Sequence, residues 1–125
     1  MESIGQGSMT EQHHQFRDHK KLGWEVKRLI ELARDFPVFD LHISEISEID
    51  TVYWFDSQYQ PTCRAVVEHT QRIHDADLSR PVILSEQGLV MDGMHRICKA
   101  ILEGLETIKA VQFLKDPEPD SVELV

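Results

Sequence analysis

Apolar residues recur at helical spacing in three stretches of the chain. The stretches 24–35 and 93–103 each place apolar side chains on one stripe, which predicts two amphipathic helices. Pro37 and Gly104 follow these stretches as helix-terminating residues. A third helix is predicted over 64–77, which contains neither Gly nor Pro. The residues expected to face the core are Val26, Leu29, Ile30 and Ala33 in the first helix, Met94, Ile97, Cys98, Ile101 and Leu102 in the second, and Val66, Thr70, Ile73 and Ala76 in the third.

Alternating or short apolar runs predict the strands. Residues 39–43 alternate between apolar and polar, which is typical of a half-buried strand. The runs 82–84 and 89–91 flank a Ser-Glu-Gln-Gly turn and predict a hairpin, and 108–113 predicts a last strand. A short helix over 44–50 and an ordered loop over 51–63 are expected between the first strand and the third helix. Helices alternate with short strands, so we expect an α+β domain with one small mixed sheet.

The length of 125 residues allows one domain, expected over 11–115. We expect 1–10 to be disordered, the N-terminal region that holds His13, His14 and His19 to be frayed, and 116–125 to form a mobile acidic tail. The composition, 41% hydrophobic and 28% charged, is that of a soluble globular chain. No apolar run exceeds four residues, so no membrane span is expected and the cytoplasm is the predicted compartment. Two cysteines without a pairing motif are expected to be free thiols.

Charge limits the partners. The chain carries 13 Lys and Arg against 22 Asp and Glu, a net charge of −9. The excess is concentrated in 40–78, with two basic and eight acidic residues, and in the tail. Nucleic-acid affinity comes largely from basic surfaces, so direct DNA binding is not expected. Residues 80–115 hold five basic and four acidic residues, which leaves this segment able to host an anion.

The candidate chemistry lies where the hairpin meets the second helix. Asp92-Gly93 precedes a first helical turn that carries His95 and Arg96. The first N–H groups of a helix lack internal acceptors and lie at its positive pole, so phosphate is a favoured ligand there. Gly93 permits close approach to the backbone, and Arg96 offers a fork of donors matched to phosphate oxygens. The alternative is that Asp92 simply caps the helix, which needs no ligand.

The run 81–113, PVILSEQGLVMDGMHRICKAILEGLETIKAVQF, resembles the core of the ParB/sulfiredoxin-like superfamily. That family includes CTP-hydrolysing partition proteins, ATP-using sulfiredoxins and ADP-using free-serine kinases, and this helix start typically holds nucleotide phosphates. The resemblance implies a ParB/sulfiredoxin-like fold, with phosphate held by Gly93, Met94, His95 and Arg96. Met94 stands where sulfiredoxins carry their reactive cysteine, so sulfiredoxin activity is not expected. Only twelve residues follow Phe113, so centromere binding is not expected either.

In the family, the helix before the hairpin also faces the nucleotide. Arg64 and Thr70 are therefore the leading further candidates for nucleotide contacts, ahead of His69 and Arg72. The aromatic side chains of the preceding loop, at Tyr53, Trp54 and Tyr59, are candidates to stack on a base. A metal site made from His69, Asp92 and His95 is the weaker alternative. We expect no metal site of the protein's own, and expect Mg²⁺ to arrive with the nucleotide.

Two functions are compatible with these residues. The first is a stand-alone nucleotide-binding domain for ATP, ADP or CTP with Mg²⁺. Hydrolysis or phosphoryl transfer could then take place at the helix start, with Asp92 and His95 as catalytic residues. The second is a non-catalytic regulatory module that binds a protein partner, or a second copy, through the acidic middle segment and tail. The residues favour the first function for binding and leave catalysis open.

Overall fold

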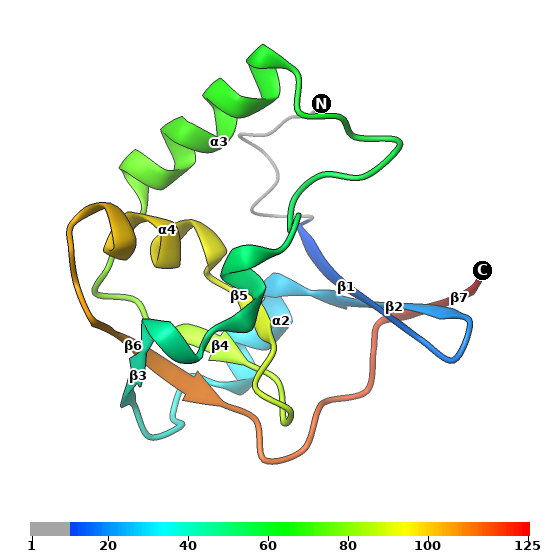
Figure 1. Ribbon diagram of the computed structural model, residues 1–125. Coiled ribbons are helices and arrows are strands. Elements are labelled where there is room, and N and C mark those ends of the chain that lie inside the picture. The colour runs from blue at the N-terminus through cyan, green and yellow to red at the C-terminus, as the bar shows by residue number, and fades with distance from the viewer. Residues whose placement is uncertain (1–10) are drawn as a thin grey trace.

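A four-stranded mixed sheet forms the centre of the molecule (Figure 1). The structure is a computed structural model that describes residues 11–125, so the segment 1–10 lies outside the described residues. The sheet order is β3-β6-β4-β5, with β4 parallel to β6 and the other neighbours antiparallel. These strands and the α+β class confirm the pattern-based prediction. The bounds are Phe39–His42 for β3, Val82–Leu84 for β4, Val90–Asp92 for β5 and Thr107–Gln112 for β6.

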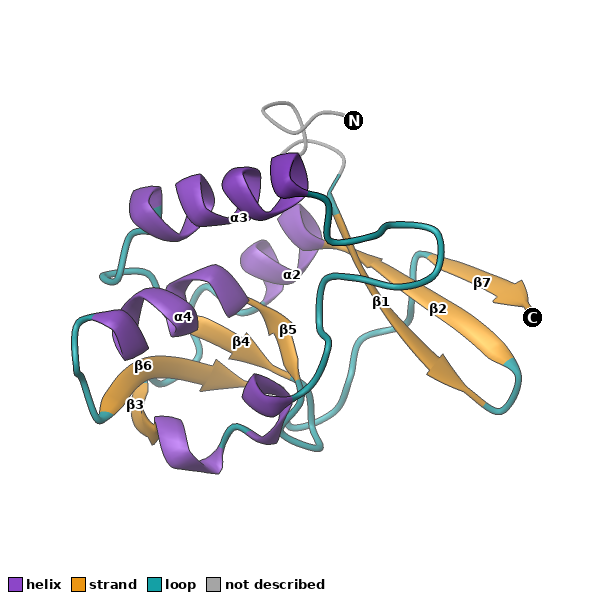
Figure 2. Ribbon diagram, turned by 45° about the horizontal axis from the view of Figure 1, so that its top comes forward, coloured by secondary structure: helices purple, strands orange, loops and turns teal. Residues whose placement is uncertain are grey.

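Helices cover one face of this sheet and contribute to the cover of the other (Figure 2). On one face, Val82 and Leu84 share a core with Ile97 of α4 (Met94–Leu102). On the other face, Ile83 shares a core with Leu29 of α2 (Val26–Leu32). A strand buried on both faces is apolar at every position, which explains the unbroken Val-Ile-Leu run of β4. Helix α3 (Cys63–Asp75) packs over α4, and its last carbonyl groups accept from the Lys99 ammonium.

The predicted helices are present, but the face that α3 buries differs from the prediction. Helix α2 begins at Val26 because Trp24 belongs to a strand. Helix α3 buries Ala65 and His69, whereas Val66, expected in the core, is 48% exposed. The face of α3 that meets α4 carries His69, whose imidazole centroid lies 5.0 Å from that of His95. The predicted short helix at 44–50 is present as two 3₁₀ turns, Ile43–Glu45 and Ser47–Asp50.

Helix α4 also departs in part from its predicted apolar stripe. Met94 and Ile97 are buried as expected. Ile101 and Leu102 were expected in the core and are exposed instead. Arg96 is buried in their place, because its guanidinium finds polar partners inside the protein. No helix within residues 11–125 combines the length and apolar composition required to cross a membrane.

A second sheet, which the sequence did not predict, projects from the molecule (Figure 1). It has the antiparallel order β1-β2-β7, with β1 at Gln12–Arg17, β2 at Lys20–Glu25 and β7 at Ser121–Leu124. The expectations of a single sheet, of a frayed region around His13, His14 and His19, and of a mobile tail are therefore wrong. Asp18 and His19 form the two-residue turn between β1 and β2, both with positive φ (51° and 64°). Such a turn matches the twist of a hairpin.

The tail is held by contacts to the β2–α2 junction. The indole N–H of Trp24 donates to the carbonyl of Pro117 at 2.8 Å. The carboxylate of Asp120 accepts from the backbone N–H of Glu25 at 2.8 Å and from the guanidinium of Arg28 at 3.2 Å. These long-range bonds give β7 a fixed place beside β2.

Removal of the Asp120 carboxylate is expected to loosen β7 and leave the main sheet intact. A charged hydrogen bond contributes about 1.5–3 kcal/mol when it is well buried. The Asp120 side chain is 26% exposed, so we expect Asp120→Ala to cost about 1 kcal/mol. Hydrogen exchange should become faster at the amides of Ser121–Leu124 and stay unchanged in β4. Unchanged exchange in β7 would contradict the anchoring role of Asp120.

Candidate functional site

Helix α4 begins without a side-chain cap. Gly93 occupies the N-cap position with φ 117° and ψ 17°, a left-handed conformation that favours glycine. Within residues 11–125 no side chain accepts a hydrogen bond as a cap of this helix. The alternative in which Asp92 caps the helix is therefore not what the structure has. The first backbone N–H groups of α4, at Met94 and His95, have no side-chain cap at its positive pole.

The turn at Gly93 is also closely packed. A Cβ atom at this position would lie 3.1 Å from Cγ2 of Val82 and 3.2 Å from Nη2 of Arg96. Gly104 provides a comparison, since it has φ 75° and a Cβ atom there would meet nothing within 4 Å. The two glycines share the left-handed conformation and differ in the space around them.

Gly93→Ala is therefore expected to destabilise the protein more than Gly104→Ala. Left-handed strain applies to both variants and costs about 1–2 kcal/mol. Crowding against Val82 and Arg96 should add about 1 kcal/mol at Gly93 alone. Urea denaturation of both variants measures the difference. Equal losses of unfolding free energy would show that the β5–α4 turn tolerates a side chain.

The Arg96 guanidinium is buried beside Gly93, where groups of the protein itself bind it. One guanidinium nitrogen donates to the carbonyl groups of Arg80 and Pro81, at 2.9 and 2.8 Å. The other donates to the Asp92 carboxylate at 2.6 Å, with side-chain exposures of 8% and 13% for the pair. The two predicted roles, Arg96 as a phosphate contact and Asp92 as a base, are both replaced by this ion pair. Each group neutralises the other and fixes the β5–α4 turn.

His95 forms a hydrogen-bonded pair with His69 of α3. Nε2 of His95 lies 2.8 Å from Nδ1 of His69, and Nε2 of His69 lies 3.2 Å from the hydroxyl of Tyr59. The two imidazole planes differ by 16° and their centroids are 5.0 Å apart. Nearly parallel rings joined at this nitrogen distance lie edge to edge, in roughly one plane. The result is a chain of three groups from Tyr59 to His95.

The loop 51–62 covers the histidine pair. The indole of Trp54 stacks on both imidazoles, with 4.4 Å between centroids in each case. Phe55 meets His69 edge-on at 5.3 Å. Figure 2 shows this loop running beside the end of α4 that β5 enters. Of the predicted stacking residues, Trp54 and Tyr59 therefore lie at the site, and Tyr53 donates its hydroxyl to the carbonyl of Val90.

Burial keeps the histidine pair neutral. Desolvation, then the charges of His69, Arg72 and Arg96, lowers the pKa of His95 to about 3. Desolvation and Arg72 also lower the pKa of His69, against a smaller opposite effect of Glu68. A neutral imidazole has one N–H and one acceptor nitrogen, so the pair shares a single proton between its facing nitrogens. His95 is therefore a neutral hydrogen-bonding group, not the cation that phosphate binding would favour.

Charged groups of both signs surround the start of α4. Arg72, Arg80 and Arg96 lie close enough to the Glu11 carboxyl to lower its pKa. Burial and the nearby Asp92 outweigh them, so the pKa of Glu11 is raised. Sequence reasoning missed Glu11, because it precedes a hairpin that was not predicted. It considered His69 and His95 together only as metal ligands with Asp92, and it missed the hydrogen bond that joins them.

The structure does not bring the other predicted residues to the site. Arg64 is exposed near the beginning of α3, and the hydroxyl of Thr70 donates to the carbonyl of Val66 within the same helix. Met94 contributes a buried side chain to the core and can offer a ligand only its amide. Asp92 turns to Arg96, so it does not converge with His69 and His95 on a metal. Among residues 11–125, no group of three or more His, Cys, Asp or Glu side chains is arranged to hold a metal ion.

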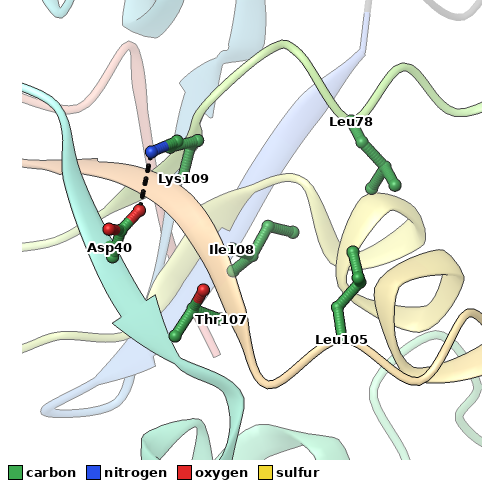
Figure 3. A pocket seen from close by; sticks show the side chains of 6 residues that line it. All are labelled: Asp40, Leu78, Leu105, Thr107, Ile108 and Lys109. Atoms are coloured by element: carbon green, nitrogen blue, oxygen red, sulfur yellow. Dashed lines mark hydrogen bonds and ion pairs between the residues drawn. The ribbon is translucent and has the colours of Figure 1, made fainter.

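A shallow pocket lies elsewhere, beside β6 and the chain that follows α4 (Figure 3). Leu78, Leu105 and Ile108 form its apolar part. Its charged groups, Asp40 and Lys109, pair with each other at 2.8 Å on the surface. Apart from the Thr107 hydroxyl, its polar side chains are thus committed to each other, and we assign no ligand to it.

The segment that carries the family resemblance, 81–113, forms one continuous unit of β4, β5, α4 and β6. Its strand, hairpin and helix follow the predicted order. The resemblance to ParB/sulfiredoxin-like proteins itself stays a prediction. No protein-family model, no curated protein and no solved structure matches this chain.

Proposed function

We propose that the start of α4 binds the phosphate groups of a nucleotide such as ATP, ADP or CTP. The observation that carries the proposal is the uncapped helix start at Gly93, beside a surface of aromatic and imidazole rings. Backbone N–H groups at a helix start favour phosphate through hydrogen bonding and through the helix dipole. The β4-β5-α4-β6 order supports a ParB/sulfiredoxin-like fold as part of the same proposal.

The roles of the site residues differ from those in the sequence-based prediction. The amides of Met94 and His95 contact phosphate, and Gly93 allows its approach. Arg96 and Asp92 are positioning residues, because their ion pair holds the turn and leaves neither free for ligand. Arg72 supplies positive charge, since it lies close enough to both histidines to lower their pKa.

The binding free energy of a nucleotide requires contacts beyond the helix start. A helix start contributes about 0.3–1 kcal/mol, or up to about 2 kcal/mol where it is partly buried. Millimolar affinity requires about 4 kcal/mol, so contacts to the base must supply the remainder. Trp54 is half-buried and Tyr59 is 38% exposed, so both retain accessible aromatic surface, Trp54 against both histidines and Tyr59 against His69. Glu11 opposes an anion while ionised, and Mg²⁺ bound to the nucleotide would offset that charge.

Calorimetric titration with ADP, ATP and CTP, each with Mg²⁺, tests the proposal. We expect at least one nucleotide to bind the wild type, and Arg72→Gln to weaken binding by about three- to tenfold. Arg34→Gln is the matched control, because it removes the same charge from the end of α2 on the opposite face of the sheet. The absence of a binding signal with every nucleotide at about 5 mM would contradict the proposal. Equal weakening of nucleotide binding by Arg72→Gln and Arg34→Gln would contradict it as well.

One observation favours the alternative of a protein-interaction module. Strand β7 lies at the edge of its sheet, and Val122 and Leu124 on it are 57% and 81% exposed. An edge strand with exposed apolar residues can pair with a strand of another chain. Under this alternative, nucleotide titrations are silent and sedimentation shows a concentration-dependent dimer or a complex with a partner.

A further inference from the structure

We propose that Tyr59, His69 and His95 form a proton relay that serves the ligand site at the start of α4. The relay takes a proton from a water molecule that attacks phosphorus in the bound nucleotide, and releases a proton to solvent at Tyr59. This inference rests on the proposed function and adds a catalytic role to it. Neither Tyr59 nor His69 touches phosphate in this proposal.

The geometry of the chain carries the inference. Two successive contacts, 3.2 Å and 2.8 Å, connect the Tyr59 hydroxyl with His69 and His69 with His95. Both ring nitrogens of His69 are engaged, one on each side, so its only polar function in the structure is to connect its neighbours. Tyr59 is 38% exposed, which gives one end of the chain access to water. His95 is the second residue of α4, which places the other end beside the uncapped amides.

Two proton arrangements satisfy the same contacts. In the first, Nε2–H of His95 donates to Nδ1 of His69, and Nε2–H of His69 donates to the Tyr59 oxygen, which leaves Nδ1 of His95 as an acceptor. In the second, every bond is reversed: Tyr59 donates to His69, His69 donates to His95, and Nδ1 of His95 carries the proton. Each imidazole stays neutral in both arrangements. Conversion of the first into the second moves one proton across the whole chain.

The surroundings favour transfer over storage of the proton. His95 is desolvated, and Trp54 covers both rings. The charges near the pair are Arg72 and Glu68 on α3 and Arg96 on α4. Among residues 11–125, Arg72 and Arg96 oppose a cation on the pair, and Glu68 favours one. A proton that arrives at Nδ1 of His95 is therefore expected to be matched by the departure of another from the Tyr59 end.

The reaction balances without an oxidant or reductant. The water oxygen forms a bond to the terminal phosphorus, and the bond between that phosphorus and the bridging oxygen breaks. The bridging oxygen leaves with the bonding electron pair, as the new end of the shortened nucleotide. The water molecule gives a proton to Nδ1 of His95. His95 then gives its Nε2 proton to Nδ1 of His69. His69 gives its own Nε2 proton to the Tyr59 oxygen. Tyr59 returns its own proton to solvent.

Phosphate release from ATP and CTP, with Mg²⁺ and at saturating nucleotide, tests the relay. We expect His69→Gln, which cannot exchange tautomers, to lower kcat by about a hundredfold and change affinity less than threefold. Tyr59→Phe should lower kcat about tenfold, and because Tyr59 is partly exposed this variant should fold normally. His74→Gln is the matched control, since His74 lies on the exposed side of α3 and only its backbone carbonyl is used.

A second readout separates a relay from a purely structural role. Wild-type kcat should show a solvent deuterium isotope effect that is smaller or absent in His69→Gln. The pH profile of wild-type kcat should stay flat between about pH 7 and pH 8, because burial lowers the pKa of both histidines. Retained kcat in His69→Gln, or an unchanged isotope effect, overturns the relay.

The outcomes also distinguish the relay from the proposed function. Nucleotide binding without phosphate release in the wild type overturns the relay and leaves the binding site intact. The absence of nucleotide binding overturns both. Binding, turnover and a selective loss of turnover in His69→Gln support both.

Discussion

Arg96→Ala is expected to lower the free energy of unfolding by about 3–5 kcal/mol, the range measured when one partner of a buried ion pair is removed. The substitution leaves the Asp92 carboxylate, whose side chain is 13% exposed, without its ion-pair partner. It also removes the donor that binds the carbonyls of Arg80 and Pro81. Domains of this size are stable by about 5–15 kcal/mol. We therefore expect a marked fall in the urea midpoint, or a chain that is largely unfolded.

Two further variants give this result its meaning. Asp92→Asn keeps an acceptor for the guanidinium and should cost less than Arg96→Ala, at about 1–3 kcal/mol. Arg34→Ala removes an exposed side chain that makes no hydrogen bond among residues 11–125 and should change stability by less than about 0.5 kcal/mol. A loss below about 1 kcal/mol for Arg96→Ala would mean that Arg96 is not held as the structure has it.

Stability is expected to fall steeply as the pH drops from about 6.5 to 4. Desolvation lowers the pKa of His95 to about 3 and that of His13 to about 4. In the unfolded chain both histidines titrate near 6.5. Below that pH the unfolded state therefore binds more protons than the folded state, which lowers the free energy of unfolding. The stability is therefore fully present above pH 6.5 and is lost as the pH falls toward the folded-state values.

The variant His95→Gln isolates the contribution of His95. Its stability should fall less steeply between pH 6.5 and 4, by about 2 kcal/mol over that range after allowance for the partial exposure of His95. The carboxyl groups of Glu11 and Glu48, whose pKa values burial raises, act in the opposite sense in both proteins and cancel in the comparison. His74→Gln should keep the wild-type slope. Parallel curves for wild type and His95→Gln would contradict a buried, neutral His95.

The four-stranded sheet and the helices were predictable because their residues follow simple periods. The run Val82–Leu84 is apolar throughout, and α4 repeats apolar residues at helical spacing. The three-stranded sheet lacks such signals. Its hairpin turns at Asp18-His19 and not at the Asn-Gly or Asp-Gly pair that identifies this turn type. Strand β7 is exposed at all four residues, so its position depends on distant contacts such as that of Asp120.

The candidate site was predictable in its backbone and not in its side chains. Gly93 before an amphipathic helix correctly predicted where the helix begins, whereas the left-handed conformation of Gly93 was not predicted. The Asp92–Arg96 pair joins the last residue of β5 to the first turn of α4, so helical spacing did not predict it. The hydrogen-bonded chain Tyr59–His69–His95 was not predicted either, because it brings together a loop and two helices. The sequence had suggested His69 and His95 together only as metal ligands. Only tertiary packing places those three residues together.

The central claim is that the backbone amides at the start of α4 receive phosphate. The most direct test is a nuclear magnetic resonance titration of the ¹⁵N-labelled protein with ADP and Mg²⁺, observed at the backbone amides. We predict that the amide resonances of Met94 and His95 move furthest and saturate together. The amide resonances of α2, on the opposite face of the four-stranded sheet, should not move. Saturable shifts confined to other residues, or none at all, would contradict the claim.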